Sequence, residues 1–303
     1  MLDKLQQIIG KGKIRQNVSL GVYSTFKLGG KAEYLVQAET EEDIINAVQA
    51  AHTFKLNITI LGGISNVIIG EGGIKGIVIR NLTSDKKVIQ DEKDFVLLEV
   101  SSGYYITRLA KETAEMGYEG IEFHYGLPGT IGGAVYMNSK WSGHQPTKYV
   151  GDVVHTAKTI DREGKQNIRD KAYLKFAYDY SFIQETKEII LNVTLKLKKN
   201  VPKQLTERCM QAMDYRRRTQ PYGVATSGCF FKNVNGQSVG KMIDDLGLKG
   251  YSIGGAEIST IHANFIVNKQ NATPEDVRKL VDYIKKKIKK AYNVDIEEEV
   301  IFL

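Results

Sequence analysis

Two glycine-rich loops carry residue types from which a large ligand-binding site could be built. The first, residues 61–66 (LGGISN), follows an apolar segment that predicts a strand. Its backbone N–H groups can face a diphosphate, and two polar side chains can add hydrogen bonds. The loop lacks the GxGxxG and GxxxxGK[ST] patterns, so ordinary turn glycines remain an alternative. The candidate cofactor-binding residues of this loop are Gly62, Gly63, Ile64, Ser65 and Asn66.

The second loop, residues 126–138 (GLPGTIGGAVYMN), has four glycines in its first eight residues. Backbone that approaches a bulky planar ligand needs residues without a Cβ, and Pro128 stiffens the approach. Together with Gly29 and Gly30, the two loops predict glycine-lined edges around one large cofactor. The candidate cofactor-binding residues here are Gly126, Pro128, Gly129, Thr130, Gly132, Gly133 and Asn138.

The chain has two cysteines, Cys209 and Cys229. They are too few for a disulfide framework and have no His or Cys neighbours at metal-ligand spacing, so we expect no metal site. Cys229 lies in the segment SGCFFKN, where composition alone favours a small buried thiol beside two phenylalanines. A thiol with an ordinary pKa of about 8.5 is also a stronger acid than an alcohol, so an acid role is the alternative.

The elements that must position these residues follow from the hydrophobic pattern. We expect a strand, a turn at Gly29 and Gly30, and a second strand within residues 23–40, then a helix after a capping box of Thr40 and Asp43. Further strands are expected at residues 58–61, 77–79, 95–101, 153–161, 188–199 and 297–303, and helices through 109–114, from 202 to about 217, from 238 and from 274. The pattern indicates an α+β chain in three parts.

Composition and charge exclude several classes of protein. The 303 residues are 42% hydrophobic and 25% charged, which is ordinary globular usage, and no window approaches 18 consecutive apolar residues. We expect a cytoplasmic monomer that neither enters a membrane nor binds nucleic acid. The net charge is +7, but seven bases and one acid fall within residues 278–290. The apolar residues there form one helical stripe, so the bases are interpreted as its solvated face.

Five segments, in order along nearly the whole chain, resemble one enzyme family. They are YSTFKLGGKAEYLV, LGGISNVIIGEGG, GIEFHYGLPGTIGGAVYMN, SGCFFKNVNGQSVGKMIDDLGLKGYSIGGAEISTIHANFIVN and EEEV. The family is UDP-N-acetylenolpyruvoylglucosamine reductase, also called UDP-N-acetylmuramate dehydrogenase, in its shorter type. The resemblance implies a three-domain α+β flavoprotein: residues 1–81 and 82–199 would bind FAD as in the vanillyl-alcohol oxidase type, and residues 200–303 would bind the UDP-sugar.

The resemblance also implies a reaction in peptidoglycan precursor synthesis. NADPH would reduce FAD, hydride would pass to C3 of the enolpyruvyl ether, and an acid would protonate C2. Cys229 stands at the acid position, where many members have serine, and Glu299 matches a catalytic glutamate. Four residues match substrate-binding positions: Tyr178, Arg216, Lys232 and Asn233.

One departure concerns the catalytic positions. The family has Tyr-Arg-x-Ser where this chain has residues 178–181 (YDYS), so Asp179 replaces an arginine expected beside the substrate carboxylate. A like charge about 4 Å from a developing enolate would cost about 4 kcal/mol at an effective dielectric near 20. Unless another base compensates, we expect impaired turnover. Three bases are candidates: Lys140, Arg162 and Arg169.

A second departure lies in the first loop, where Ile64 replaces a small glycine and is expected to crowd the diphosphate. Two alternatives to the reductase therefore stay open. One is a divergent FAD-binding homologue with weak or no reductase activity that serves as a binding or regulatory protein. The other is a flavin oxidoreductase that acts on another substrate.

Overall fold

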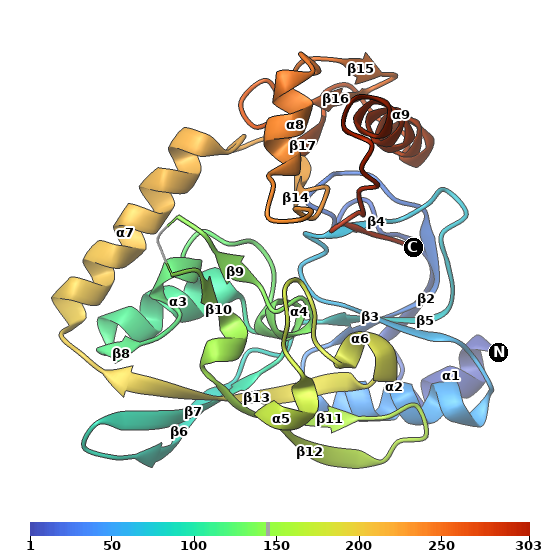
Figure 1. The fold of residues 1–303 in the computed structure, drawn as a ribbon. Coiled ribbons are helices and arrows are strands. Elements are labelled where there is room, and N and C mark those ends of the chain that lie inside the picture. The colour runs from blue at the N-terminus through green and yellow to red at the C-terminus, as the bar shows by residue number, and fades with distance from the viewer. Residues whose placement is uncertain (144–145) are drawn as a thin grey trace. The chain divides into compact units, whose positions relative to one another are not determined.

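The computed structural model, drawn in Figure 1, describes residues 1–143 and 146–303. Contacts within the chain divide it into two compact units. Each unit is assembled from segments that are far apart in the sequence. The predicted division into residues 1–81, 82–199 and 200–303 therefore stays a prediction. Unit 1 comprises Met1–Gln16, Glu33–Gly63 and Lys75–Tyr215, and unit 2 comprises Asn17–Ala32, Ile64–Ile74 and Arg216–Leu303.

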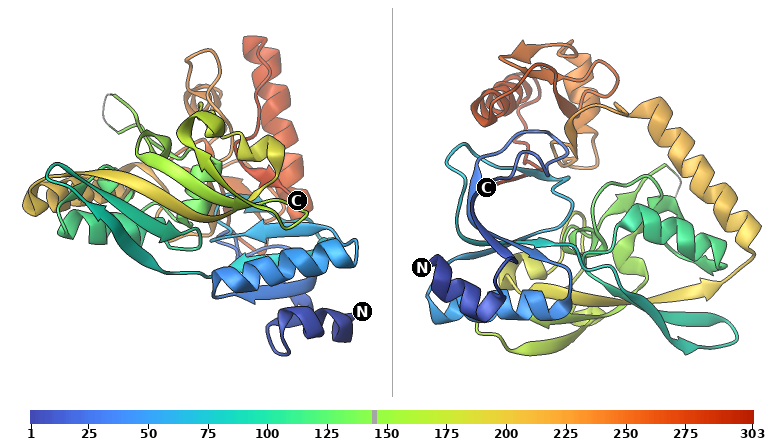
Figure 2. Two further views of the ribbon diagram at one scale, coloured as in Figure 1. Left: turned by 90° about the horizontal axis from the view of Figure 1, so that it is seen from below. Right: turned by 180° about the vertical axis from the view of Figure 1, so that it is seen from behind.

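The first sheet, which lies mostly in unit 1, has the strand order β1-β2-β5-β3. The expected strands at 58–61 and 77–79 are confirmed as β3 and β5, which run parallel with Ile58 opposite Ile77. Helices α1 and α2 lie against this sheet (Figure 2) and share its apolar core. The bounds are α1 Leu2–Ile9, β1 Ile14–Ser19, β2 Lys31–Ala38, α2 Glu41–Thr53, β3 Ile58–Leu61 and β5 Ile74–Asn81.

The second sheet of unit 1 is antiparallel, with the order β12-β11-β13-β7-β6, and β8 also pairs with β13. The expected apolar positions along β13 are buried, namely Leu191, Val193, Leu195 and Leu197, and Lys196 is exposed, but Thr194 between them is buried as well. Helices α3 and α4 contribute to the same core. The bounds are β6 Lys86–Asp91, β7 Phe95–Ser101, α3 Ile106–Glu115, β8 Tyr118–Glu119, α4 Ile131–Tyr136, β11 Val154–Ile160, β12 Gln166–Asp170 and β13 Ile189–Lys199.

Short elements complete unit 1: η1 Glu122–His124, β9 Lys140–Trp141, β10 Lys148–Tyr149, η2 Val150–Asp152, α5 Lys171–Leu174 and α6 Ile183–Thr186. The long helix α7, Pro202–Thr219, extends beyond Tyr215, the last residue of unit 1. The α7 helix confirms the expected helix from residue 202.

Unit 2 contains a four-stranded sheet, β14-β17-β16-β15, and a parallel pair, β18-β4. The closing strand is shorter than expected, because only Ile301 and Phe302 pair with β4. The apolar core of unit 2 contains residues from all three of its sequence segments, including Phe26, Ile68 and Phe230. The bounds are β4 Val67–Ile68, β14 Thr226–Cys229, α8 Val239–Asp245, β15 Ser252–Ile253, β16 Ala256–Ile258, β17 Phe265–Asn268, α9 Pro274–Tyr292 and β18 Ile301–Phe302.

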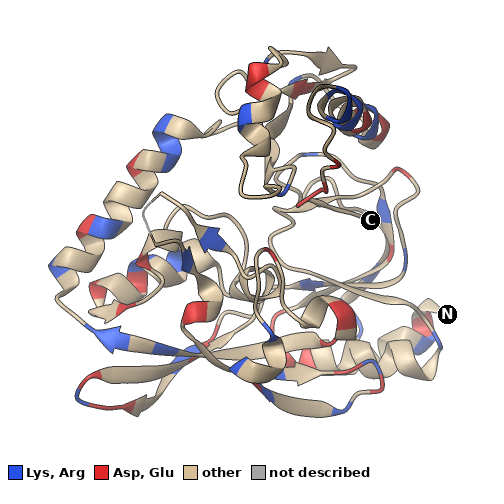
Figure 3. Ribbon diagram, in the orientation of Figure 1, with Lys and Arg blue, Asp and Glu red and all other residues tan. Residues whose placement is uncertain are grey.

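Helix α9 confirms the interpretation of the basic segment. It begins at the expected capping box of Thr273 and Asp276, with Pro274 at its first position. Its apolar stripe is buried, and its bases lie at the other positions of the helix. Figure 3 shows that Lys and Arg recur along this helix. Two of them form ion pairs with acids of the following segment, Lys285 with Glu298 and Lys289 with Asp295.

The expected strand at residues 23–28 is wrong. The segment forms successive turns, with the N–H of Tyr23 donating to the Leu20 carbonyl and the N–H of Lys27 donating to the Ser24 carbonyl. Close packing at the neighbouring glycines explains the difference. A Cβ on Gly21 would lie 3.1 Å from the Leu28 carbonyl carbon, and one on Gly30 would lie 2.5 Å from the Gly70 oxygen.

Within the described ranges, no helix combines the length and apolar character that a membrane span requires. Residues 1–143 and 146–303 also hold no cluster of three His, Cys, Asp or Glu side chains suited to a metal ion.

The expected capping box of α2 is present, and Asp43 is its buried acid. The Asp43 carboxylate accepts hydrogen bonds from the backbone N–H groups of Glu39 and Thr40 and pairs with Lys13. Burial alone would raise the pKa of Asp43, but these interactions outweigh it and lower the pKa below its ordinary value. The ionised side chain therefore stabilises the folded state.

We predict that Asp43→Asn lowers the free energy of unfolding at pH 7 by about 1–2 kcal/mol. The wild-type advantage is present above the ordinary Asp pKa of about 3.9 and is lost as the pH falls through the lower folded-state pKa. Urea unfolding at a series of pH values should therefore show a difference that shrinks toward acid. Asp282→Asn, at an exposed position of α9, is the control. A difference that stays constant into acid would contradict the prediction.

Candidate functional site

The two glycine-rich loops meet within unit 1. A Cβ on Gly62 would overlap the Thr130 hydroxyl, and a Cβ on Gly63 would lie 2.8 Å from the Gly129 Cα. The loops therefore approach at a distance that no side chain allows. The sequence was interpreted as placing these glycines around a ligand, but at Gly62 and Gly63 the second loop itself requires them.

The glycines of the second loop differ in whether the backbone conformation and packing of the protein require them. Gly126 and Gly129 have φ values of 85° and 109°, which L side chains rarely adopt. A Cβ on Gly132 would lie 2.9 Å from Ser102. Gly133 is exposed, has ordinary helical geometry, and its Cβ would meet only the Thr130 hydroxyl at 3.7 Å.

Gly133 is therefore the glycine that fits a bound cofactor. Glycine inside a helix costs about 1 kcal/mol relative to alanine, and no neighbour in unit 1 requires it there. An open backbone edge beside two closely packed loops suits a planar or diphosphate group that approaches from outside the protein. The residues of the loop thus fit the cofactor that the sequence predicts.

The rest of the first loop belongs to unit 2 and holds the C-terminal segment. Ile64 is buried with φ 48°, a strained conformation for a β-branched residue, which explains why glycine suits this position. The Asn66 amide donates to the Glu299 carbonyl at 3.2 Å, and the Asn66 carbonyl accepts from the N–H of Ile301 at 3.0 Å. Ser65 stands between Ile64 and Asn66 in the sequence of this loop.

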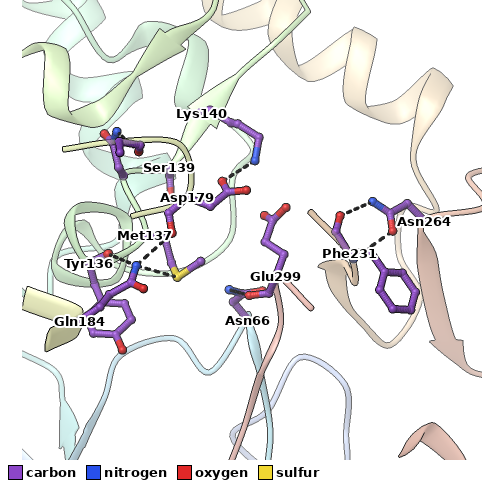
Figure 4. Close-up of polar contacts among 12 residues, drawn as sticks. Asn66, Tyr136, Met137, Ser139, Lys140, Asp179, Gln184, Phe231, Asn264 and Glu299 are labelled. Atoms are coloured by element: carbon purple, nitrogen blue, oxygen red, sulfur yellow. Dashed lines mark hydrogen bonds and ion pairs between the residues drawn. The ribbon is translucent and has the colours of Figure 1, made fainter. Parts of the chain in front are cut away.

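Lys140 supplies the compensating charge beside Asp179. The ammonium group forms an ion pair with Asp179 Oδ1 (Figure 4), and the Lys140 Nζ lies 4.3 Å from the centre of the Tyr178 ring. Arg169 pairs with Glu188 instead, with 3.1 Å between Nε and Oε2. Arg162 is exposed. Of the three candidates, Lys140 is the base that contacts Asp179.

Hydrogen bonds from both sides fix the turn that carries Tyr178 and Asp179. Ala177 and Tyr180 exchange backbone hydrogen bonds of 3.1 and 3.3 Å. The side-chain amide of Asn138 donates to the Ala177 carbonyl at 2.8 Å, and its oxygen accepts from the N–H of Gly151 at 2.9 Å. Asn138, a predicted cofactor-binding residue, thus has both ends of its amide on backbone groups.

Gln184 was not among the residues singled out from the sequence. Its Nε2 lies 3.0 Å from the Asp179 carbonyl and 2.9 Å from the Tyr136 carbonyl, so it ties the turn to the end of α4 (Figure 4). Nothing in its spacing distinguishes it from an ordinary glutamine of a short helix.

In unit 2, the buried cation Arg216 interacts electrostatically with the half-buried Cys229. Arg216 is 7% exposed, and burial lowers the pKa of its guanidinium to about 10, while Cys229 acts in the opposite direction. A pKa near 10 keeps Arg216 charged at neutral pH. A cation beside a thiol stabilises the thiolate that remains after a proton is transferred.

The C-terminal segment brings Glu299 to the residues that follow Cys229. The N–H of Glu299 donates to the Phe230 carbonyl at 2.8 Å, and the N–H of Lys232 donates to the Glu297 carbonyl at 3.0 Å. In Figure 4 the Glu299 carboxylate lies at the opposite end of its side chain from the Asn66 contact. Ion pairs also hold this run of glutamates, with Glu297 bound to Lys232 and Glu298 to Lys285.

Two further contacts hold this segment. The Asn233 oxygen accepts from the N–H of Val239 at 3.3 Å, at the start of α8. The side chain of Asn264 was not expected to matter, but it accepts from the N–H of Phe231 at 3.0 Å and donates to its carbonyl at 2.8 Å (Figure 4). It acts as an additional strand partner for the residues after Cys229.

Comparison with known proteins covers both parts of the chain. Residues 32–167 match the family described as "FAD binding domain", and residues 220–303 match "UDP-N-acetylenolpyruvoylglucosamine reductase, C-terminal domain". The UDP-N-acetylenolpyruvoylglucosamine reductase of Prochlorococcus marinus (strain NATL2A) is 36% identical over 291 residues, which is 95% of this chain and 97% of that protein.

Two solved structures are similar. The UDP-N-acetylenolpyruvylglucosamine reductase of Thermus caldophilus has a TM-score of 0.79 and 30% identity, and the match covers 95% of this chain and 99% of that one. Phl p 4.0202, a glucose dehydrogenase, has a TM-score of 0.50 and 16% identity over 66% of this chain and 44% of its own. The second likeness concerns the fold alone, which is the FAD-binding fold of the vanillyl-alcohol oxidase type.

We predict that FAD binds without a covalent bond. Neither glycine-rich loop contains a His or Cys as an attachment point. The nearest candidate, His124, is fully buried, and its Nε2 lies 3.2 Å from the Ser139 carbonyl oxygen. Denaturation followed by filtration should therefore release all of the flavin. Flavin that stays on the polypeptide would contradict this.

We also predict opposite effects of Gly133→Ala on stability and on FAD binding. The apoprotein should become more stable by up to about 1 kcal/mol, because alanine favours the helix, while FAD binds more weakly. Denaturant unfolding of the apoprotein and a flavin fluorescence titration measure the two quantities. Gly72→Ala, where a Cβ meets nothing within 4 Å, is the control for FAD affinity. Unchanged FAD affinity in Gly133→Ala would remove Gly133 from the cofactor site.

Proposed function

Because the chain belongs to the UDP-N-acetylenolpyruvoylglucosamine reductase family, we propose that it makes UDP-N-acetylmuramate for peptidoglycan synthesis, with NADPH as the electron donor. The observation that carries the proposal for its active site is the backbone contact between Glu299 and Phe230, which brings the two candidate proton-handling residues, Cys229 and Glu299, to one place in unit 2. The cytoplasmic location and the monomeric state remain predictions.

The flavin part of the site is assigned to the two glycine-rich loops. FAD, when bound, supplies the hydride that reduces the carbon–carbon double bond of the enolpyruvyl group. The open backbone at Gly133 would face the cofactor, with Thr130 in the same loop. Ser65 and Asn66 of the first loop stay candidate cofactor-binding residues. What the protein must then provide is orientation of the substrate, stabilisation of negative charge and a proton.

Cys229 is proposed as the proton donor to C2 of the substrate. Its side chain is half-buried at the end of β14, where it remains accessible. Loss of the proton leaves a thiolate, which the charged guanidinium of Arg216 stabilises. Arg216 thereby favours proton transfer from the thiol, and it is also proposed to contact the substrate.

Glu299 is proposed as a second group that acts on the developing charge. Its neighbours Glu297 and Glu298 form ion pairs with Lys232 and Lys285. Glu299 is assigned this role because it matches the catalytic glutamate of the family. Lys232, Asn233 and Tyr178 are proposed to contact the substrate. These assignments rest on the matching positions in the family.

The alternative of an inactive binding homologue was motivated by Asp179. Its carboxylate is paired with Lys140, so the unpaired like charge on which that alternative rested is absent. The reductase is therefore the function that we propose.

The function is tested on the purified protein with FAD bound. NADPH should bleach the flavin absorption bands, and the enolpyruvyl substrate should then restore them with formation of UDP-N-acetylmuramate. Bleaching without recovery would contradict the proposed substrate, and the absence of bleaching would contradict the proposed electron donor.

We predict that Cys229→Ala separates the two half-reactions. Reduction of the flavin by NADPH should stay near the wild-type rate, while its reoxidation by the enolpyruvyl substrate should slow sharply. Cys229→Ser should retain much of the activity, since serine occupies this position in many relatives. Stopped-flow absorbance measures both rates.

Cys209→Ala is the matched control. Cys209 is buried, and burial raises the pKa of its thiol to about 12, so it is not suited to proton transfer near neutral pH. Its loss should leave both half-reactions unchanged. Equal slowing of both half-reactions in Cys229→Ala would indicate a folding defect and contradict the acid role.

A further inference from the structure

The ion pair of Lys140 and Asp179 is poorly explained by folding alone. The side chains are only 18% and 3% exposed. A buried ion pair contributes little stability compared with apolar side chains of similar size, because both charges lose their hydration. Asp179 also has a φ of 51°, which costs free energy at a residue other than glycine. Such costs are typical of functional sites.

The surroundings hold the ammonium group of Lys140 in one place. Asp179 Oδ1 contacts it on one side, and the ring of Tyr178 lies on another at 4.3 Å. Asp179 Oδ2 is buried and accepts no hydrogen bond from the residues that the structure describes. The pair is thus arranged to fix the position of the lysine and not to satisfy both carboxylate oxygens.

Lys140 also lies next to the predicted cofactor site. It begins strand β9, two residues after the end of the loop at 126–138, whose exposed Gly133 fits a cofactor. Gln184 links the Asp179 turn to Tyr136 at the end of α4. The fixed ammonium group and the glycine-rich loop therefore form one structure within unit 1.

We propose that Lys140 binds the carboxylate of the enolpyruvyl substrate and that Asp179 is a positioning residue for it. This inference rests on the proposed function, because that substrate carries a carboxylate into which negative charge moves as its double bond is reduced. An ammonium group has three N–H donors, so it can serve Asp179 and a substrate carboxylate at once. Positive charge thus stays in the site although residue 179 is acidic.

The experiment compares Lys140→Met, Lys140→Arg and Lys148→Met as full-length proteins with FAD bound. Lys148 lies on strand β10, which pairs with β9, and its exposed side chain makes it a matched control for loss of charge. Calorimetry with the product UDP-N-acetylmuramate measures binding without turnover. Stopped-flow absorbance measures flavin reduction by NADPH and reoxidation by the substrate.

Lys140→Met should weaken product binding and lower kcat/KM for the enolpyruvyl substrate by roughly 10- to 100-fold, the usual effect of removing a hydrogen bond to a charged group. Flavin reduction by NADPH should not change. Lys140→Arg should recover most of the loss, and Lys148→Met should behave like the wild type. If thermal unfolding shows that Lys140→Met does not fold, Lys140→Gln replaces it as the variant without the ammonium group, with the same measurements and the same expected losses.

Variants at Asp179 test the positioning role. Asp179→Asn keeps an acceptor and tolerates the left-handed backbone, so it should raise KM only a few-fold. Asp179→Ala removes the acceptor and should raise KM further while leaving flavin reduction unchanged. If Asp179 only supported the fold, its substitution would lower the thermal stability without this selective rise in KM.

Two results would overturn the inference, and they are distinguishable. If Lys140→Met and Lys140→Gln fold and bind the product as the wild type does, the pair is structural and the proposed function stands. If the wild type binds FAD but its reduced flavin is not reoxidised by the enolpyruvyl substrate, the proposed function fails and the inference fails with it.

Discussion

The geometry of unit 1 around the predicted cofactor site depends on close contact between the two glycine-rich loops at positions where the first loop has no side chain. Gly63 lies against Gly129, and Gly62 lies against Thr130. Even a methyl group at either glycine of the first loop would force the loops apart. Helix α4 lies within the second loop and strand β9 follows it, so their positions depend on the same contact. The absence of two Cβ atoms thus sets where the edge of α4 and the ammonium group of Lys140 lie.

The sequence predicts elements well where the signal is local. The capping boxes at Thr40 and Thr273 fix the starts of α2 and α9 through hydrogen bonds within a single turn. Alternation along β13 likewise reflects a sheet with one strongly buried face. The segment at 23–28 was mispredicted because its turns depend on contacts of Gly30 with residues 70–73, which no local pattern records.

The candidate site shows a similar limit. Its proton-handling and substrate-binding residues came from the family resemblance, because a lone cysteine or a run of glutamates has no distinctive pattern of its own. The sequence could name three bases as partners for Asp179 but could not choose among them, since Lys140 is 39 residues away along the chain. It also could not separate Gly133 from the glycines that internal packing requires. That distinction depends on which atoms surround each Cα.

Unit 2 is built from segments that are far apart in the sequence, and this limits how its gene segments can be exchanged by recombination in evolution. Its core combines Phe26 and Ile68 with Phe230 and the buried face of α9, and strand β18 has its partner in β4. Closing a loop of more than two hundred residues carries an entropic cost, and the contacts that repay it form only once the early and late segments meet. The later segment therefore cannot be transferred to another protein by a single cut and splice. The segments of the two units alternate along the chain, so recombination is expected to preserve the pair as one genetic module.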